Sequence, residues 1–124
     1  MKYLISLFFS LTMSFCNAQN AVNNTNELKK EVIIVYGSDS CHSCLKTKAF
    51  LKDIKVKFTY YDIDVNKEKE QEMLVKLQQN NISIYTLNLP VIDNKGDIFL
   101  NKGNLKEFLK VLEKKMKKNE NQKT

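Results

Sequence analysis

One junction constrains the fold of this chain more than any other feature: a β-branched run passes directly into a helical pattern, and two cysteines stand at the change. Residues 31–36 form the run, which is typical of a strand covered on both faces, and residues 37–40 are polar turn formers. Over residues 41–54 the core-facing side repeats at helical spacing. That side carries Cys44, Thr47, Leu51 and Ile54. The pattern therefore places Cys41 and Cys44 at the start of a helix that follows a central strand.

The next part of the chain continues this alternation of strand and helix. Residues 55–65 alternate with period two and predict a second strand, which a right-handed crossover should place beside the first and parallel to it. Asn66 offers a helix cap, and residues 67–80 keep one apolar stripe among many charges. The stripe consists of Met73, Leu74 and Leu77. A second helix should therefore lie on the sheet.

A hairpin and a closing helix complete the pattern. Residues 87–92 and 96–100 predict two antiparallel strands, joined by a polar turn at residues 93–95. Asn104 and Glu107 make a capping-box-like start, and apolar residues follow at helical spacing. The predicted order is therefore β-α-β-α-β-β-α, an α/β fold in which a four-stranded mixed sheet is flanked by three helices.

The first residues have the pattern of a segment that is removed on export. Residues 1–18 combine one early lysine, an interrupted apolar stretch and a small-residue end, which is typical of a signal peptide cleaved after Ala18. A lipid anchor on Cys16 is the alternative, and otherwise Cys16 is a small apolar residue of the discarded peptide. The rest of the chain divides into a flexible leader (19–30), one domain (31–117) and a frayed basic tail (118–124). We therefore expect a periplasmic or secreted protein.

The basic charge of the chain is spread rather than concentrated. The 20 cations are all lysines, they stand against 14 acidic residues, and the formal net charge is +6. Phosphate recognition tends to combine lysine with arginine forks, whereas these lysines are scattered over helix faces and the tail. We therefore expect no nucleic-acid partner, and we expect a monomer.

The spacing of the two cysteines suits disulfide exchange. Exchange needs a thiolate that attacks a disulfide and a second thiol that resolves the mixed intermediate. Cys41 would lie where free backbone N–H groups and the positive end of the helix stabilise an anion, so it is the predicted nucleophile. Cys44 is the predicted resolving thiol. His42 and Ser43 are the predicted redox-tuning residues, although an exposed loop histidine would have little influence.

Two other roles of the pair remain open from the residues alone. CxxC is also half of a zinc site, but structural zinc takes four ligands and the exported chain offers only Cys41, Cys44 and His42. Transfer of Cu(I) or Zn is the form that this alternative would take, and we expect no resident metal. The second role is a purely structural disulfide, which would close so short a loop that it would add little stability.

Three short motifs stand at matching places in the pattern. They are Cys41-His42-Ser43-Cys44 after the first strand, Leu89-Pro90-Val91 before the third strand, and Gly103-Asn104-Leu105 at the last helix. Over residues 31–116 they resemble the glutaredoxin family and its thioredoxin-like fold. The resemblance implies a thiol–disulfide oxidoreductase whose redox-active group is a Cys41–Cys44 disulfide, with no other cofactor. It also implies that Leu89 and Pro90 bind the substrate, with a cis peptide bond between them.

The chain departs from that family at the positions that serve glutathione. Glutaredoxins usually have a proline after the first cysteine, an aromatic before the second, a lysine shortly ahead of the pair and an aspartate at the last helix. This chain has His42, Ser43, Ser38 and Asn104 there. The departures argue against glutathione and leave protein thiols and disulfides as the expected partners, with reduction favoured over oxidation. A membrane partner would supply electrons, since the chain has no nicotinamide or flavin motif.

Overall fold

The computed structural model of the protein describes residues 32–121. The predicted signal peptide and leader, Cys16 and residues 122–124 lie outside this range. The described chain forms β1 (Ile33–Gly37), α2 (His42–Asp53), β2 (Phe58–Asp62), α3 (Lys67–Gln79), β3 (Val91–Asn94), β4 (Asp97–Leu100) and α4 (Leu105–Asn121). This order confirms the predicted β-α-β-α-β-β-α arrangement.

The strands form one mixed sheet with the order β2-β1-β3-β4. β1 pairs in parallel with β2 and antiparallel with β3, and β3 pairs antiparallel with β4. β1 is therefore a central strand, and all five of its residues are buried, as its β-branched run predicts. The arrangement is the predicted thioredoxin-like fold.

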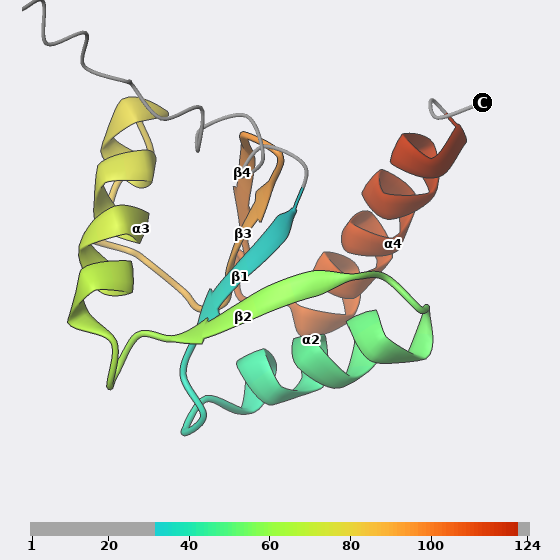
Figure 1. Cartoon of the computed structure of the whole chain (residues 1–124), viewed down its shortest axis with the longest axis horizontal. Coiled ribbons are helices and arrows are strands. Elements are labelled where there is room, and N and C mark those ends of the chain that lie inside the picture. Colours follow the sequence, from blue (N-terminus) through green and yellow to red (C-terminus); the bar gives the residue numbers. More distant parts are fainter. Residues whose placement is uncertain (1–31, 122–124) are drawn as a thin grey trace, which may run out of the picture.

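Alternate side chains of β1 enter two separate cores on the two faces of the sheet. Val35 packs with residues of α2 and α4, whereas Tyr36 packs with residues of α3. Figure 1 shows the same three layers, with α2 and α4 on one side of the sheet and α3 on the other. Cys44, Thr47 and Leu51 of the predicted α2 pattern are buried, and Ile54, the C-cap residue, is partly buried against the same core. The central strand is thus fixed from both faces immediately before it leads to Cys41.

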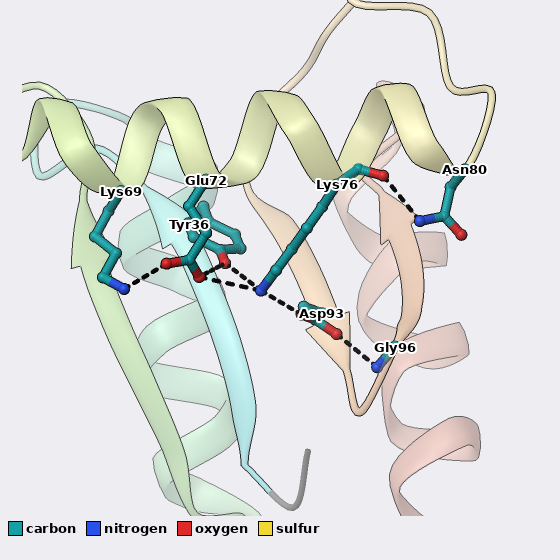
Figure 2. Close-up of polar contacts among 7 residues, drawn as sticks. All are labelled: Tyr36, Lys69, Glu72, Lys76, Asn80, Asp93 and Gly96. Atoms are coloured by element: carbon teal, nitrogen blue, oxygen red, sulfur yellow. Dashed lines mark hydrogen bonds and ion pairs between the residues drawn. The ribbon is translucent and has the colours of Figure 1, made fainter. Parts of the chain in front are cut away.

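A polar network ties α3 to the centre of the sheet (Figure 2). The Tyr36 hydroxyl donates to Glu72 Oε1 at 2.6 Å and accepts from Lys76 Nζ at 2.7 Å. Lys76 Nζ also donates to Asp93 Oδ2 at 2.7 Å, and Lys69 donates to the other Glu72 oxygen. Burial by itself would raise the pKa of Glu72, but the hydrogen bonds from Lys69, Tyr36 and Lys76 lower it to about 2. The network therefore holds α3 through an ionised Glu72.

The hairpin differs from the prediction in the position of its turn. The sequence predicts strands at residues 87–92 and 96–100 with a turn at 93–95, whereas β3 continues to Asn94 and the turn is Lys95-Gly96. Both turn residues have positive φ, 56° and 98°, which is the backbone that a two-residue hairpin loop requires. The Asp93 side chain accepts from Gly96 N at 2.7 Å. Asp93 and Asn94 therefore complete β3 instead of forming the turn.

The last helix, α4, includes residues 118–121, which belong to the predicted basic tail. Two side-chain contacts lie in the last part of α4: Lys117 pairs with Glu113 at 2.6 Å, and the Asn119 amide donates to Asn94 Oδ1 at 3.0 Å. Among residues 32–121 there is no helix with the length and apolar character needed to cross a membrane.

Candidate active site

The cysteine pair lies at the point where β1 ends and α2 begins. Cys41 is the N-cap residue of α2, with extended backbone angles (φ −94°, ψ 116°). Its N–H donates to the Ser38 carbonyl at 3.0 Å, and its sulfur accepts from the Cys44 N–H at 3.4 Å. A sulfur thus takes the place of the oxygen that usually caps a helix. This geometry confirms that the pair opens the helix.

The two sulfurs differ in exposure. Cys41 is half-buried, whereas Cys44 has no exposed surface, and both are free cysteines in this structure. Burial, followed by the hydrogen bond with Cys41, raises the pKa of the Cys44 thiol to about 12. α2 has no acidic residue in its first turn that would oppose a negative charge on Cys41. The site therefore holds one accessible sulfur in front of one enclosed and protonated thiol.

The two residues between the cysteines face different surroundings. His42 is exposed as the first residue of α2, and Ser43 is half-buried. The Ser43 carbonyl accepts from Thr47 Oγ1 at 2.7 Å, which fixes the first turn of the helix internally. The redox-tuning role of His42 and Ser43 stays a prediction.

The substrate-binding residues expected from the resemblance come to the same end of the sheet. In the register of β1 and β3, Tyr36 is opposite Val91, so the residues that precede Val91 run alongside Gly37 and the turn that leads to Cys41. The Leu89–Pro90 peptide bond is cis, as the resemblance implies. Pro90 is fully buried and Leu89 is half-buried. The fold thus brings Leu89 and Pro90 to the end of the sheet where β1 leads to the cysteine pair, while their role in binding stays a prediction.

A serine–aspartate clasp fixes the turn before Cys41, and the sequence did not predict it. Ser38 Oγ donates to Asp64 Oδ2 and lies 2.7 Å from Ser40 Oγ, which is 3.3 Å from the same carboxylate oxygen. The Ser40 N–H donates to Ser38 Oγ at 3.2 Å. Asp64 follows β2, so the clasp joins the ends of two parallel strands. Ser38 therefore helps to position the turn that leads to Cys41.

Tyr60 is a second residue of this region to which the sequence assigns no role. It extends from β2 under α2, where its ring is covered by Lys48 Nζ, 4.1 Å from the ring centroid. Among the other tyrosines, Tyr36 is buried on the opposite face and Tyr85 is 95% exposed. The sequence gives one clue to the position of Tyr60, which is its place in a predicted strand parallel to β1.

Metal ligands do not gather around the pair. Within residues 32–121, no three histidine, cysteine or acidic side chains converge in an arrangement that could hold a metal ion. The chemistry of this donor set is that of two thiols, which can join to each other or to another sulfur.

Comparison with known proteins is informative for the first part of the domain. The glutaredoxin family model matches residues 33–86, a segment that contains the cysteine pair and every element from β1 to α3. Comparisons with curated proteins and with solved structures found no significant match. The protein therefore has a thioredoxin-like fold, and its residues 33–86 form a segment of glutaredoxin type with a Cys41–Cys44 CxxC pair.

Proposed function

We propose that the protein is an exported thiol–disulfide oxidoreductase that exchanges disulfides with protein substrates through Cys41 and Cys44. The observation that carries the proposal is the asymmetry of the pair. Cys41 is accessible at a helix N-terminus, whereas Cys44 is enclosed directly behind it. Two-step exchange uses an accessible attacking thiolate and a shielded resolving thiol. The match of residues 33–86 to glutaredoxins supports the same reaction class.

In the first step, the Cys41 thiolate attacks one sulfur of a substrate disulfide. A new bond forms between Cys41 Sγ and that sulfur, the substrate disulfide breaks, and the other substrate sulfur leaves as a thiolate that takes up a proton. The N–H groups of the first turn of α2, including that of Cys44, stabilise the attacking anion. The half-exposed position of Cys41 lets a protein disulfide approach it.

In the second step, Cys44 loses its proton and attacks Cys41 Sγ. The mixed disulfide breaks, the second substrate sulfur leaves and is protonated, and a Cys41–Cys44 disulfide remains. Two electrons have then passed from the cysteine pair to the substrate. Because Cys44 is fully buried, no outside disulfide competes for it before the mixed disulfide forms.

The direction of exchange is proposed as reduction, with oxidation as the less favoured direction. Strongly oxidising pairs owe their potential to a stabilised reduced form. Here burial disfavours the Cys44 thiolate, so this sulfur adds no such stabilisation. The electrons would come from a membrane partner, and the extended substrate would lie beside Leu89 and Pro90. Export rests on the signal-like pattern of residues 1–18.

Reduction of insulin with dithiothreitol as the electron source tests the proposal. We expect the mature protein to accelerate precipitation of the insulin B chain, and we expect Cys41→Ser to abolish the acceleration because the attacking sulfur is gone. Equal activity of the wild type and Cys41→Ser would contradict the proposal. Purification with one equivalent of copper or zinc, together with no insulin reduction, would instead favour a metal-transfer role.

A further inference from the structure

Tyr60 carries a buried hydroxyl without a hydrogen-bond partner. Of the side-chain oxygen and nitrogen atoms buried within residues 32–121, this hydroxyl is the one that makes no hydrogen bond. A buried hydroxyl that lacks a partner destabilises the folded protein, and replacing it with a hydrogen atom would remove that cost. The Tyr60 hydroxyl therefore does not stabilise the resting protein, and the role of this group is to be sought in the reaction.

The hydroxyl and the side chain of Cys44 both approach Gly37. A Cβ atom placed on Gly37 would be 2.7 Å from the Tyr60 hydroxyl oxygen and 3.1 Å from Cys44 Cβ. Both groups therefore crowd the same point beside the backbone of Gly37, and only glycine leaves room for them. The Cys44 sulfur is one bond beyond its Cβ, so the hydroxyl and the sulfur belong to the same small region around Gly37.

Lys48 covers the ring that carries this hydroxyl. Lys48 Nζ lies 4.1 Å from the ring centroid and pairs with Asp39 at 3.5 Å. Lys48 is one turn after Cys44 on α2, so the helix that carries the resolving thiol also covers the ring. The Tyr60 ring is thus covered by the helix that carries Cys44.

We propose that the Tyr60 hydroxyl donates a hydrogen bond to the Cys44 sulfur when this sulfur becomes a thiolate in the resolving step. The inference rests on the proposed exchange reaction and assigns a further catalytic residue to it. In the resting dithiol the hydroxyl makes no well-formed hydrogen bond, although the Asp39 carboxylate also acts on it, and in the resolving step it gains an anionic sulfur as its partner. The hydrogen bond therefore acts on the second step and leaves the first unchanged.

The protons of this step balance without a net contribution from Tyr60. Cys44 releases its proton, its sulfur bonds to Cys41 Sγ, and the departing substrate sulfur takes up a proton. Tyr60 keeps its own proton throughout, because burial and then the charge of Cys44 raise its pKa above the ordinary value. It is thus a donor and not a base. Burial raises the pKa of the Cys44 thiol to about 12 although the backbone N–H of Ser38 lowers it, and the Tyr60 hydroxyl would act together with this N–H.

The two steps can be timed separately with Ellman's reagent, a small aromatic disulfide. Attack by Cys41 releases one thionitrobenzoate and leaves the other on Cys41, and resolution by Cys44 releases the second. In Tyr60→Phe we expect the first release at the wild-type rate and the second roughly tenfold slower, the effect of losing one hydrogen bond to a charged sulfur. Cys44→Ser marks the first phase alone.

Tyr61→Phe is the matched control. Tyr61 is the next residue of β2, but it packs into the core on the opposite face of the sheet. We expect both phases to keep their wild-type rates in this variant. An unchanged second phase in Tyr60→Phe, or an equal slowing in Tyr61→Phe, would overturn the inference. Absence of a second release from the wild type would instead count against the exchange reaction itself.

Thermal unfolding of the same variants separates a catalytic from a structural role. Tyr60→Phe removes the unpaired hydroxyl and keeps the ring, so we expect a melting temperature equal to or above that of the wild type. Slower resolution in a protein of undiminished stability would support the proposal. A lower melting temperature accompanied by slowing of both phases would show that Tyr60 acts only through packing.

Discussion

At the scale of single residues, the surroundings of the two sulfurs decide which one reacts first. Cys41 caps α2 and is half-buried, and its sulfur already accepts a backbone N–H. Cys44 has the same thiol but no exposed surface, and burial raises its pKa to about 12. A thiol is therefore the expected nucleophile at Cys41 and the expected resolving thiol at Cys44, three residues later.

Alkylation of the reduced protein tests this difference. At neutral pH we expect iodoacetamide to modify Cys41 and to leave Cys44 unmodified, because the raised pKa keeps the Cys44 thiol protonated until the pH approaches about 12. Peptide mass spectrometry over a time course gives the order of modification. In Cys41→Ser, Cys44 should stay unmodified at neutral pH, and modification of both thiols at equal rates would contradict the assignment.

At the scale of the elements, the junction between β1 and α2 depends on contacts from both faces of the sheet. The clasp of Ser38, Ser40 and Asp64 fixes the turn itself. On the α3 face, the network around Glu72 and Lys76 holds Tyr36, the residue before the glycine that ends β1. Although burial alone would lower the pKa of Lys76, the hydrogen bonds that its ammonium donates to three partners raise this pKa, so the ammonium stays charged. The network therefore stabilises the strand that positions the site.

Glu72→Gln tests the energetic value of this network. The pKa of Glu72 is lowered from 4.5 to about 2 in the folded protein, so the ionised carboxylate adds stability above pH 4.5, and this contribution is lost as the pH falls toward 2. At neutral pH we expect Glu72→Gln to lower the free energy of unfolding by on the order of 2 kcal/mol, allowing for partial exposure. Urea unfolding at several pH values measures the difference between the two proteins.

Glu68→Gln on the same helix is the control, because Glu68 is exposed in the first turn of α3. Its effect should be small. A Glu72→Gln difference that stays constant from neutral pH to pH 2 would show that the loss comes from packing and not from the ionised carboxylate.

At the scale of the whole molecule, the sequence predicts the parts that depend on local pattern. The buried run before Gly37, the helical spacing after Cys41 and the caps at Asn66 and Asn104 are local signals, and each has its expected structural outcome. These signals suffice for the element order and for the position of the cysteine pair. The expected place of Pro90 comes from the resemblance to glutaredoxins, and the pairing of β1 with β3 puts it at the end of the sheet where β1 leads to Cys41.

The rest of the site depends on contacts between distant residues, which leave no local pattern. Ser38 meets Asp64, and Gly37 meets Tyr60, only because β1 and β2 lie side by side in one particular register. The sequence predicts the hairpin turn two residues too early because Lys95 adopts a positive φ, which a lysine side chain does not favour. The hydrogen bond from Gly96 N to Asp93, which also fixes the turn, forms only in the folded chain. The register of β1 and β2 therefore determines the contacts of Ser38 and Gly37, and the sequence pattern does not predict it.

Capture of substrates by Cys44→Ser, in the full chain with its own first 18 residues, tests the central claim most directly. Without the resolving thiol, Cys41 should remain joined to its substrates, so we expect extracytoplasmic mixed disulfides that appear on non-reducing gels and disappear on reduction. The double variant Cys41→Ser, Cys44→Ser is the control and should trap nothing. If Cys44→Ser traps no protein, or only the species seen with the double variant, Cys41 does not attack protein disulfides and the account is wrong.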